Sequence, residues 1–313
     1  MPLTSGSSTM LADVVLDVAS CPAVCSWTTL DTVDSTMDFC QRMLTERLEK
    51  YPEMTLPQAV RVMFNDAAMT VGDDAAARLP LSVVSADAQT AGVGRLGRQW
   101  TNQRGKSFAG TFVVAMEAAR SEAVGTGWLT TCAGLAVLDA LQCVVRRLGA
   151  RYEVPLGLKW PNDIFMDGRK LGGILSRTIA QKDGTIVVAF GIGLNLFMES
   201  EDLPIARATS LHEHVETPLP DYASLRDLLA ALIALRLRER LETSVRAPQR
   251  SRSQLRQEAL AESVTVGRPA HITLVDGRTF DAQAVDIDAD GALVVRTRAG
   301  GTLTVTVGDV GID

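Results

Sequence analysis

The apolar residues of this chain recur at two spacings, one typical of helices and the other typical of strands. Residues 27–33 can form a strand, and Asp34 or Ser35 is placed to cap a following helix. In that helix the apolar residues recur every three or four positions, at Met37, Cys40, Leu44 and Leu48. This spacing predicts an amphipathic helix with one buried stripe.

The longest helical pattern spans residues 126–148, and Gly149 is placed to end it. Further helices are predicted at 225–241 and, more briefly, at 57–69, and a surface loop at 73–77. Strands are predicted at 79–86, 107–116, 156–160, 171–179 and 185–194. Interleaved strands and helices of this kind predict an α+β fold, a mixed β-sheet with helices on one side.

Beyond Val264 the pattern changes to short strands separated by turn signals. The signals are the pairs Asp276-Gly277, Asp290-Gly291 and Gly300-Gly301. They predict a small barrel of roughly 50 residues. We therefore expect a tail at 1–26, a larger domain at 27–261 and the barrel at 262–313.

An arginine-rich segment precedes the barrel. It carries Arg246, Arg250, Arg252 and Arg256. Because no aromatic residues are interleaved with them, we interpret the segment as a solvated helical linker rather than a nucleic-acid surface.

Composition narrows the class of protein. The net charge of −6 provides no global attraction to nucleic acid. The N-terminus lacks the basic segment and apolar core of a secretory signal, and no run of about 18 apolar residues suggests a membrane span. We expect a cytoplasmic protein that binds neither DNA nor membrane.

Cysteine and histidine chemistry has little support. The five cysteines are scattered without a C-x-x-C pair, which favours reduced, buried thiols. The three histidines are dispersed, and we expect His212 and His214 to be solvated surface residues rather than metal ligands.

Residues 89–100, QTAGVGRLGRQW, are the first candidate for chemistry. Glycines at 92, 94 and 97 let backbone N–H groups approach an anion, while Arg95 and Arg98 add fixed positive charge. The segment also matches the dinucleotide fingerprint G-x-G-x-x-G, which requires a helix to follow. No helical period follows Gly97, so a loop that folds over a phosphate or carboxylate is favoured.

Three further stretches lead to a family. They are KWPNDIFMDGRKLGGIL at 159–175, FGIGLNL at 190–196, and Asp34-Ser35-Thr36. Together with the glycine-arginine loop, their order and rough spacing resemble the biotin protein ligases, from about Trp27 to the C-terminus. The resemblance implies a class II synthetase-like biotin/lipoate ligase catalytic domain and an SH3-like C-terminal domain. Since residues 1–26 leave no room for a winged helix-turn-helix, we expect the catalytic-only class.

The resemblance implies a biotin–[biotin carboxyl carrier protein] ligase with two half-reactions. Biotin's carboxylate attacks the α-phosphate of ATP to give biotinyl-5′-AMP and pyrophosphate, with Mg²⁺ assisting. A lysine of the biotin carboxyl carrier of acetyl-CoA carboxylase or a related carboxylase then attacks the anhydride. The first step brings together two anions, which repel by about 4 kcal/mol at 4 Å and an effective dielectric near 20.

The resemblance also implies the site residues. Catalytic roles fall to Lys170, Arg95 and Asp163. Biotin contacts fall to Ser35, Thr36, Met37, Gln89, Val93, Gly94, Arg95 and Lys170. ATP contacts fall to Arg95, Arg98, Trp100, Asn162, Lys170 and Asn195. Asp163 is the expected Mg²⁺ ligand, and it is also a candidate base for the incoming lysine.

Several of these residues also have a purely structural interpretation. Ser35 and Thr36 suit a helix cap, and Trp100 suits a core anchor beside the loop. Asp163 suits a turn, and Asn195 suits a left-handed turn after a strand. The sequence leaves these alternatives open.

This chain departs from the family pattern in three places. Met37 stands where the family usually has Asn, and Val93 stands where it usually has Arg. Residues 50–78 are longer than the resemblance leads us to expect, either as a tolerated insertion or as a contact with another subunit or the acceptor.

Two alternative functions remain at this stage. One is a lipoate- or octanoyl-protein ligase of the same superfamily, against which KWPND and the glycine-arginine loop argue. The other is a biotin- or adenylate-binding protein without turnover, which Met37 and Val93 keep open. The sequence also leaves open a homodimer formed through sheet edges.

Overall fold

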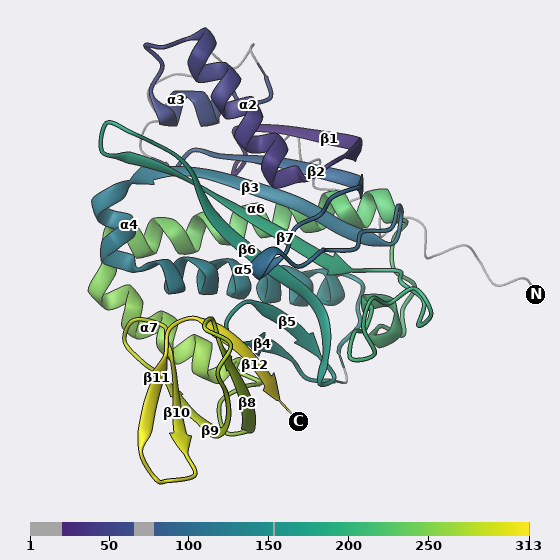
Figure 1. The fold of residues 1–313 in the computed structure, drawn as a ribbon. Coiled ribbons are helices and arrows are strands. Elements are labelled where there is room, and N and C mark those ends of the chain that lie inside the picture. Colours follow the sequence, from purple (N-terminus) through teal and green to yellow (C-terminus); the bar gives the residue numbers. More distant parts are fainter. Residues whose placement is uncertain (1–20, 66–77, 153, 313) are drawn as a thin grey trace, which may run out of the picture.

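A mixed seven-stranded sheet forms the centre of the molecule (Figure 1). The computed structural model describes residues 21–65, 78–152 and 154–312. The strands run in the order β1-β2-β3-β7-β6-β5-β4, with β1 and β2 parallel and the other pairs antiparallel. Their bounds are β1 Ser26–Val33, β2 Leu81–Gln89, β3 Ser107–Glu117, β4 Leu156–Lys159, β5 Asp163–Met166, β6 Arg169–Lys182 and β7 Thr185–Asn195. The predicted mixed sheet is confirmed.

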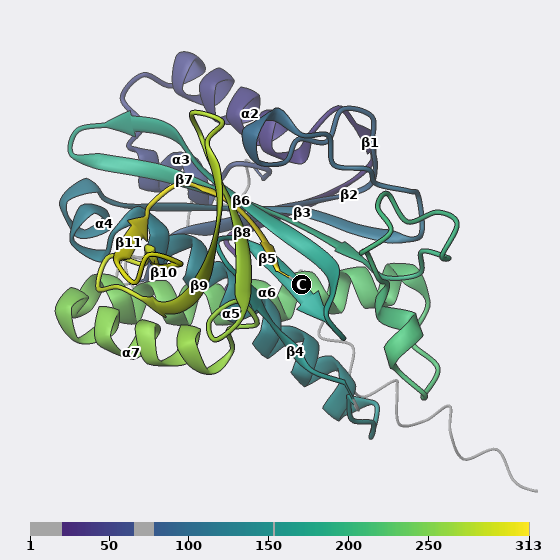
Figure 2. The same cartoon turned by 60° about the horizontal axis from the view of Figure 1, so that its bottom comes forward.

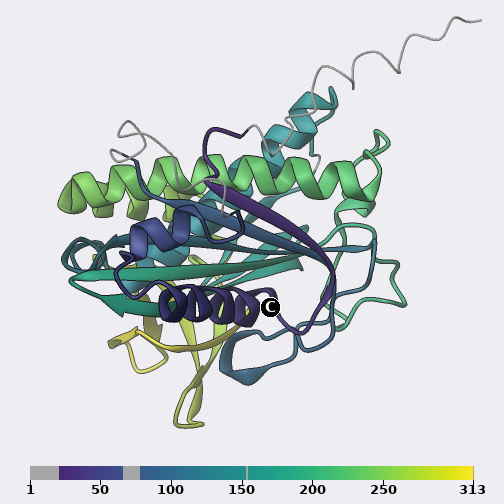
Figure 3. The ribbon, with the colours of Figure 1, turned by 90° about the horizontal axis from the view of Figure 1, so that it is seen from above.

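Helices cover both faces of this sheet (Figure 3). Neighbouring residues of β2 point to opposite faces, so Val83 packs with α5 and α6 while Val84 packs with α2 and α3. The prediction of helices on one side is therefore wrong, because β2 and β3 are apolar on both faces and each face needs a cover. The helices are α2 Thr36–Lys50, α3 Leu56–Arg61, α4 Ala118–Val124, α5 Thr126–Arg147, α6 Tyr222–Arg246 and α7 Pro248–Ala261, with 3-10 turns η4 Arg95–Gly97 and η5 Leu211–His214.

Helix α5 is long and apolar enough to cross a membrane by length and composition alone. Of its most apolar window, 72% is buried inside the protein, where it packs against α6 and the sheet. Its apolar character is therefore that of a core helix.

The first helices agree only partly with the sequence pattern. Ser35 caps α2, its side chain accepting a hydrogen bond from the Asp38 N–H, as predicted. Helix α3 is shorter than the predicted 57–69, because it ends at Arg61 and a turn follows. The end of that prediction and the predicted loop at 73–77 lie outside the described residues.

The C-terminal strands form a second, antiparallel sheet, which comes forward in Figure 2. Its order is β11-β10-β9-β8-β12, with bounds β8 Pro269–Leu274, β9 Thr279–Ile287, β10 Leu293–Thr297, β11 Thr302–Val305 and β12 Gly308–Ile312. The three predicted turns connect these strands. Gly277, Gly291 and Gly300 adopt φ values of 85°, 84° and 87°, which glycine tolerates without strain.

Helix α7 attaches the second sheet to the rest of the fold. The predicted linker is helical, and Arg246 and Arg250 are exposed as predicted, but the prediction of solvated arginines is wrong for Arg252 and Arg256. Arg252 donates to the Val124 carbonyl and to Asp290, and Arg256 donates to Asp286 and the Ile287 carbonyl. The segment therefore holds the end of β9 and the turn that follows it.

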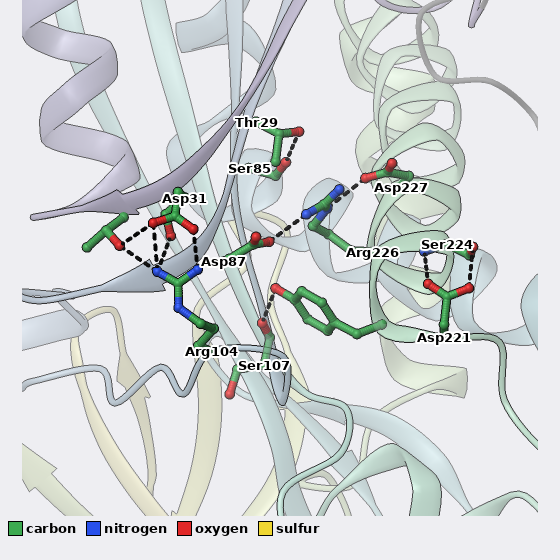
Figure 4. Close-up of polar contacts among 12 residues, drawn as sticks. Thr29, Asp31, Ser85, Asp87, Arg104, Ser107, Asp221, Ser224, Arg226 and Asp227 are labelled. Atoms are coloured by element: carbon green, nitrogen blue, oxygen red, sulfur yellow. Dashed lines mark hydrogen bonds and ion pairs between the residues drawn. The ribbon is translucent and has the colours of Figure 1, made fainter.

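A polar cluster anchors the ends of the strands that lead to the site (Figure 4). The buried guanidinium of Arg226 lies between Asp87 of β2 and Asp227, and the Tyr222 hydroxyl donates to the Ser107 carbonyl at 3.1 Å. Burial raises the pKa of Tyr222, so its hydroxyl remains a donor. These contacts hold the start of α6 against the ends of β2 and β3.

Candidate active site

A cavity of about 660 Å³ lies between the first sheet, the N-terminus of α2, residues 89–101 and strands β8 and β12. This volume is in the range of small-molecule sites, about 300–1,000 Å³. Every site residue predicted from the sequence lines it. They are Ser35, Thr36, Met37, Gln89, Val93, Gly94, Arg95, Arg98, Trp100, Asn162, Asp163, Lys170 and Asn195.

One part of the cavity is a neutral hydrogen-bonded group, here called the hydroxyl cluster: Ser35, Thr36, Gln89 and Thr111. The backbone N–H and the hydroxyl of Thr36 both donate to Gln89 Oε1, at 2.8 and 3.0 Å. The Thr111 hydroxyl donates to Thr36 Oγ1 at 2.9 Å. Ser35 both caps α2 and lines the cavity, so its structural and ligand-facing interpretations are compatible.

Glycines on β7 make room for two larger side chains that line the cavity. A Cβ at Gly191 would lie 2.9 Å from Met37 Cε, and one at Gly193 would lie 2.3 Å from Trp100 Cε2. Trp100 therefore packs closely on β7, as the core-anchor interpretation expects, and it lines the cavity as well.

A second part of the cavity is charged and is called here the charged cluster: Arg95, Arg98, Lys159, Asp163, Lys170 and Asp309. The Lys170 ammonium lies 2.7 Å from Asp163 Oδ1, and the Lys159 ammonium lies 3.7 Å from Asp163 Oδ2. Burial lowers the pKa of Lys159. The negative charge of Asp163 opposes this shift, and the positive charge of Lys170 adds to it. Asp163 lies in strand β5, so the interpretation as a turn residue is wrong.

The glycine-arginine loop folds back on itself instead of opening a helix. The Trp100 N–H donates to the Gly92 carbonyl at 2.8 Å, and the Gly94 N–H donates to the Arg98 carbonyl at 2.7 Å. A Cβ at Gly92 would lie 2.5 Å from the Trp100 carbonyl oxygen, so this close approach requires glycine. Strand β3 follows, which confirms that the segment is not a dinucleotide-binding turn.

The loop arginines contact the second sheet. Arg95 donates to Asn162 Oδ1 at 3.0 Å and to the Gly308 carbonyl at 3.3 Å, and it lies 4.0 Å from Asp309. Arg98 forms an ion pair with the same aspartate. Burial lowers the pKa of Arg95, and Asp309 opposes the shift. Strand β12 therefore completes the charged cluster.

Two buried polar atoms in the cavity have no hydrogen-bond partner among the described residues. They are the Asn195 Oδ1 acceptor and the Trp100 Nε1 donor. An unpaired buried polar group costs about 1–3 kcal/mol. Because neither atom is accessible, a ligand can pair with them only if these side chains turn towards it. Asn195 is the last residue of β7 and has no positive φ, so the left-handed-turn interpretation is wrong.

Some charged residues near the motifs serve other contacts. Arg104 pairs with Asp31, and Lys106 pairs with Asp202. Neither lines the cavity, so neither replaces the arginine missing at position 93. The expectation that both histidines are simply solvated is wrong, because both are half-buried: His212 lies 3.0 Å from Ser210 Oγ, and His214 lies 2.7 Å from Thr209 Oγ1.

Sequence reasoning missed Thr111 and Asp309, both of which line the cavity. Neither residue belongs to a motif. Asp309 contacts Arg98 across 211 positions of sequence, and Thr111 contacts Thr36 across 75. Only the folded chain reveals such contacts.

Comparisons with known proteins agree with this arrangement. The model of the Biotin/lipoate A/B protein ligase family matches residues 76–195, and that of the Biotin protein ligase C terminal domain matches residues 265–311. The biotin–[acetyl-CoA-carboxylase] ligase of Mycobacterium tuberculosis is 33% identical over 233 residues, covering 73% of this chain and 77% of the relative. The corresponding ligase of Paracoccus denitrificans is 32% identical, covering 69% and 85%.

A solved structure shares the fold. The biotin protein ligase of Aquifex aeolicus, in complex with biotin and ATP, superposes with a TM-score of 0.60 at 21% identity. The match covers 92% of this chain and 98% of that one. At this identity the likeness concerns the fold, and it includes the C-terminal sheet.

Proposed function

The chain belongs to the biotin protein ligases, and on that basis we propose how its cavity activates biotin and transfers it to a carrier lysine. One observation carries the proposal: a neutral hydroxyl cluster and a cation-rich charged cluster line the same cavity. A ligand with a polar, uncharged head and a carboxylate tail matches these two parts. Biotin has this form, with a cyclic urea at one end and a carboxylate at the other.

The ring of biotin lies in the hydroxyl cluster. Ser35 Oγ accepts from the Asp38 N–H, which leaves its own proton for the urea carbonyl. The apolar lining next to it, Met37 and Ile192, suits the hydrocarbon and thioether parts of the ring. The carboxylate then extends towards Arg95 and Lys170.

The charged cluster lowers the repulsion between the carboxylate and the α-phosphate. It contains four cations and two carboxylates, a balance of 4 − 2 = +2. Lys170 and Arg95 neutralise the charge that develops between the reacting groups. Lys159, which the sequence placed only within a motif, supplies a further cation in the absence of an arginine at position 93.

The nucleotide occupies the remaining part of the cavity. Asn195 and Trp100 line the part of the cavity that we assign to the adenosine, and Arg98 holds the outer phosphates. Mg²⁺ in phosphate sites often uses one or two carboxylates together with phosphate oxygens. The Asp163 carboxylate fits that role, and the ion would offset phosphate charge.

The second half-reaction needs a neutral amine. An ordinary lysine has a pKa of about 10.4, so a group that accepts its proton is required at neutral pH. We assign this role to Asp163, which lies beside Lys170 and faces the cavity. The acceptor is the biotin carboxyl carrier of acetyl-CoA carboxylase or a related carboxylase, as the names of the bacterial relatives suggest.

Four further points belong to the proposal. The larger domain spans 27–261 and the SH3-like domain spans 262–313. The protein acts in the cytoplasm, and it does not bind DNA. The outer strand β1 of the first sheet offers an edge for a homodimer or for the carrier, because the other outer strand, β4, already pairs with residues 262–264.

Biotin-dependent exchange between ATP and pyrophosphate tests the proposal. With Mg²⁺ present, we expect exchange with biotin and only background exchange with lipoate or octanoate. Exchange driven by lipoate or octanoate instead would establish the alternative ligase. Biotin binding without exchange would establish a binding protein.

A further inference from the structure

We propose that Thr111 is a positioning residue for biotin, because its hydroxyl holds the Thr36 hydroxyl in place at the centre of the hydroxyl cluster. The inference rests on the proposed function and deepens it. Thr111 lies in the middle of β3, opposite Gly191 of β7, and is fully buried. Its hydroxyl donates to Thr36 at 2.9 Å.

The direction of these bonds follows from one backbone group. The Thr36 N–H can only donate, so the Gln89 atom 2.8 Å from it must be the carbonyl oxygen Oε1. The Thr36 hydroxyl, 3.0 Å from that oxygen, must then spend its single proton on it. With that proton used, Thr36 can only accept from Thr111, which must donate.

The direction of these hydrogen bonds determines which donors and acceptors the hydroxyl cluster presents to a ligand. Gln89 is fixed with its oxygen towards Thr36, so its amide NH₂ is the group left for the ligand. Thr36 keeps one lone pair as an acceptor, and Ser35 keeps a hydroxyl proton as a donor. A cyclic urea has one carbonyl acceptor and two N–H donors, and it matches this combination of donors and an acceptor.

Met37 makes this ordering more important in this chain. The family usually has an asparagine here, which can offer both an acceptor and a donor, whereas methionine offers neither strongly. Met37 and Thr111 lie beside the same residue, Gly191. A Cβ added to Gly191 would be 2.9 Å from Met37 Cε and 3.8 Å from Thr111 Oγ1. Thr111 therefore supports the Thr36 hydroxyl at the place where the asparagine is lost.

The test compares Thr111→Val, which keeps the branched shape but removes the hydroxyl, with Thr111→Ser, which keeps the hydroxyl. Calorimetry measures the Kd for biotin, for dethiobiotin, which keeps the urea, and for lipoate, which lacks it. We expect Thr111→Val to raise the Kd for biotin and dethiobiotin by about 2- to 13-fold, the range of a neutral hydrogen bond. The Kd of Thr111→Ser for biotin should stay within about twofold of the wild-type value. The Kd for lipoate and the KM for ATP should also stay within about twofold of wild type in both variants.

Each other outcome has a definite meaning. An equal loss for lipoate and for biotin, with a lower Tm, would show a purely structural role and overturn the inference. So would a Thr111→Val protein that binds biotin like wild type. A wild-type protein that fails to bind biotin would instead overturn the proposed function, and the inference with it.

Discussion

The hydroxyl cluster and the charged cluster solve different physical problems in one cavity. The hydroxyl cluster is neutral, almost fully buried at Thr36 and Thr111, and built from the first sheet and α2. Its internal hydrogen bonds form before a ligand arrives, and they fix which donors and acceptors remain for the ligand. The charged cluster is partly exposed, and it joins two sheets through contacts such as Arg98 with Asp309.

This difference indicates which cluster discriminates between ligands and which cluster activates the carboxylate of biotin. A buried polar network with fixed donors rejects a ligand that leaves its groups unpaired. A group of cations stabilises charge wherever it develops, with little regard for the rest of the ligand. We therefore expect the hydroxyl cluster to determine affinity for the ring and the charged cluster to determine rate.

Asp163→Asn should give the largest effect on the charged side. If Asp163 accepts the proton of the incoming lysine, transfer from preformed biotinyl-5′-AMP to the carrier falls by about 10²-fold or more. Single-turnover transfer followed with labelled adenylate measures it. Transfer at the wild-type rate would remove Asp163 from the role of base.

Arg95→Ala should slow the first half-reaction by about 10²-fold at saturating biotin and ATP, since one charge-stabilising donor is lost. Pyrophosphate exchange is the measurement. Arg104→Ala is the matched control, because Arg104 pairs with Asp31 away from the cavity and its loss should leave exchange unchanged. Equal losses in both variants would point to a general effect of removing surface charge.

Asp309→Asn should tighten ATP binding by about 1.4- to 5-fold. The carboxylate competes with phosphate for the loop arginines, and a partly exposed ion pair contributes about 0.2–1 kcal/mol. Calorimetric titration with ATP tests this. Weaker ATP binding would mean that Asp309 chiefly holds the arginines in place.

Salt should affect ligand binding at the two clusters differently, and these effects should be small. Raising the ionic strength from about 0.05 to 0.5 M screens partly exposed charges, so the Kd for ATP should rise several-fold. The Kd for dethiobiotin alcohol, which has the urea but no carboxylate, should change by less than about twofold. Equal sensitivity of both ligands would contradict the division.

The sequence predicted the elements well where local periodicity determines them. Ser35 caps α2, the glycine-arginine segment forms a loop, and the three glycine turns join the C-terminal strands. The motif residues also meet in one cavity, as the resemblance implied. Their individual roles remain predictions.

The errors share a physical cause. The cover on the second face of the sheet, the partners of Arg252 and Arg256, and the positions of Thr111 and Asp309 depend on contacts between distant segments. Periodicity reports which side of an element is buried, but not what buries it. Thr111 is an example: on a buried strand it reads as an ordinary core residue until Thr36 is seen beside it.

Lys170→Ala tests most directly whether binding and activation are separate. Biotin Kd by calorimetry and pyrophosphate exchange should be measured on the same preparation, with Lys50→Ala on exposed α2 as control. Since the hydroxyl cluster is untouched, the Kd should rise by less than about tenfold, while exchange falls by about 10²- to 10³-fold. If the Kd rises as much as exchange falls, or if exchange persists, the division of labour between the two clusters is wrong.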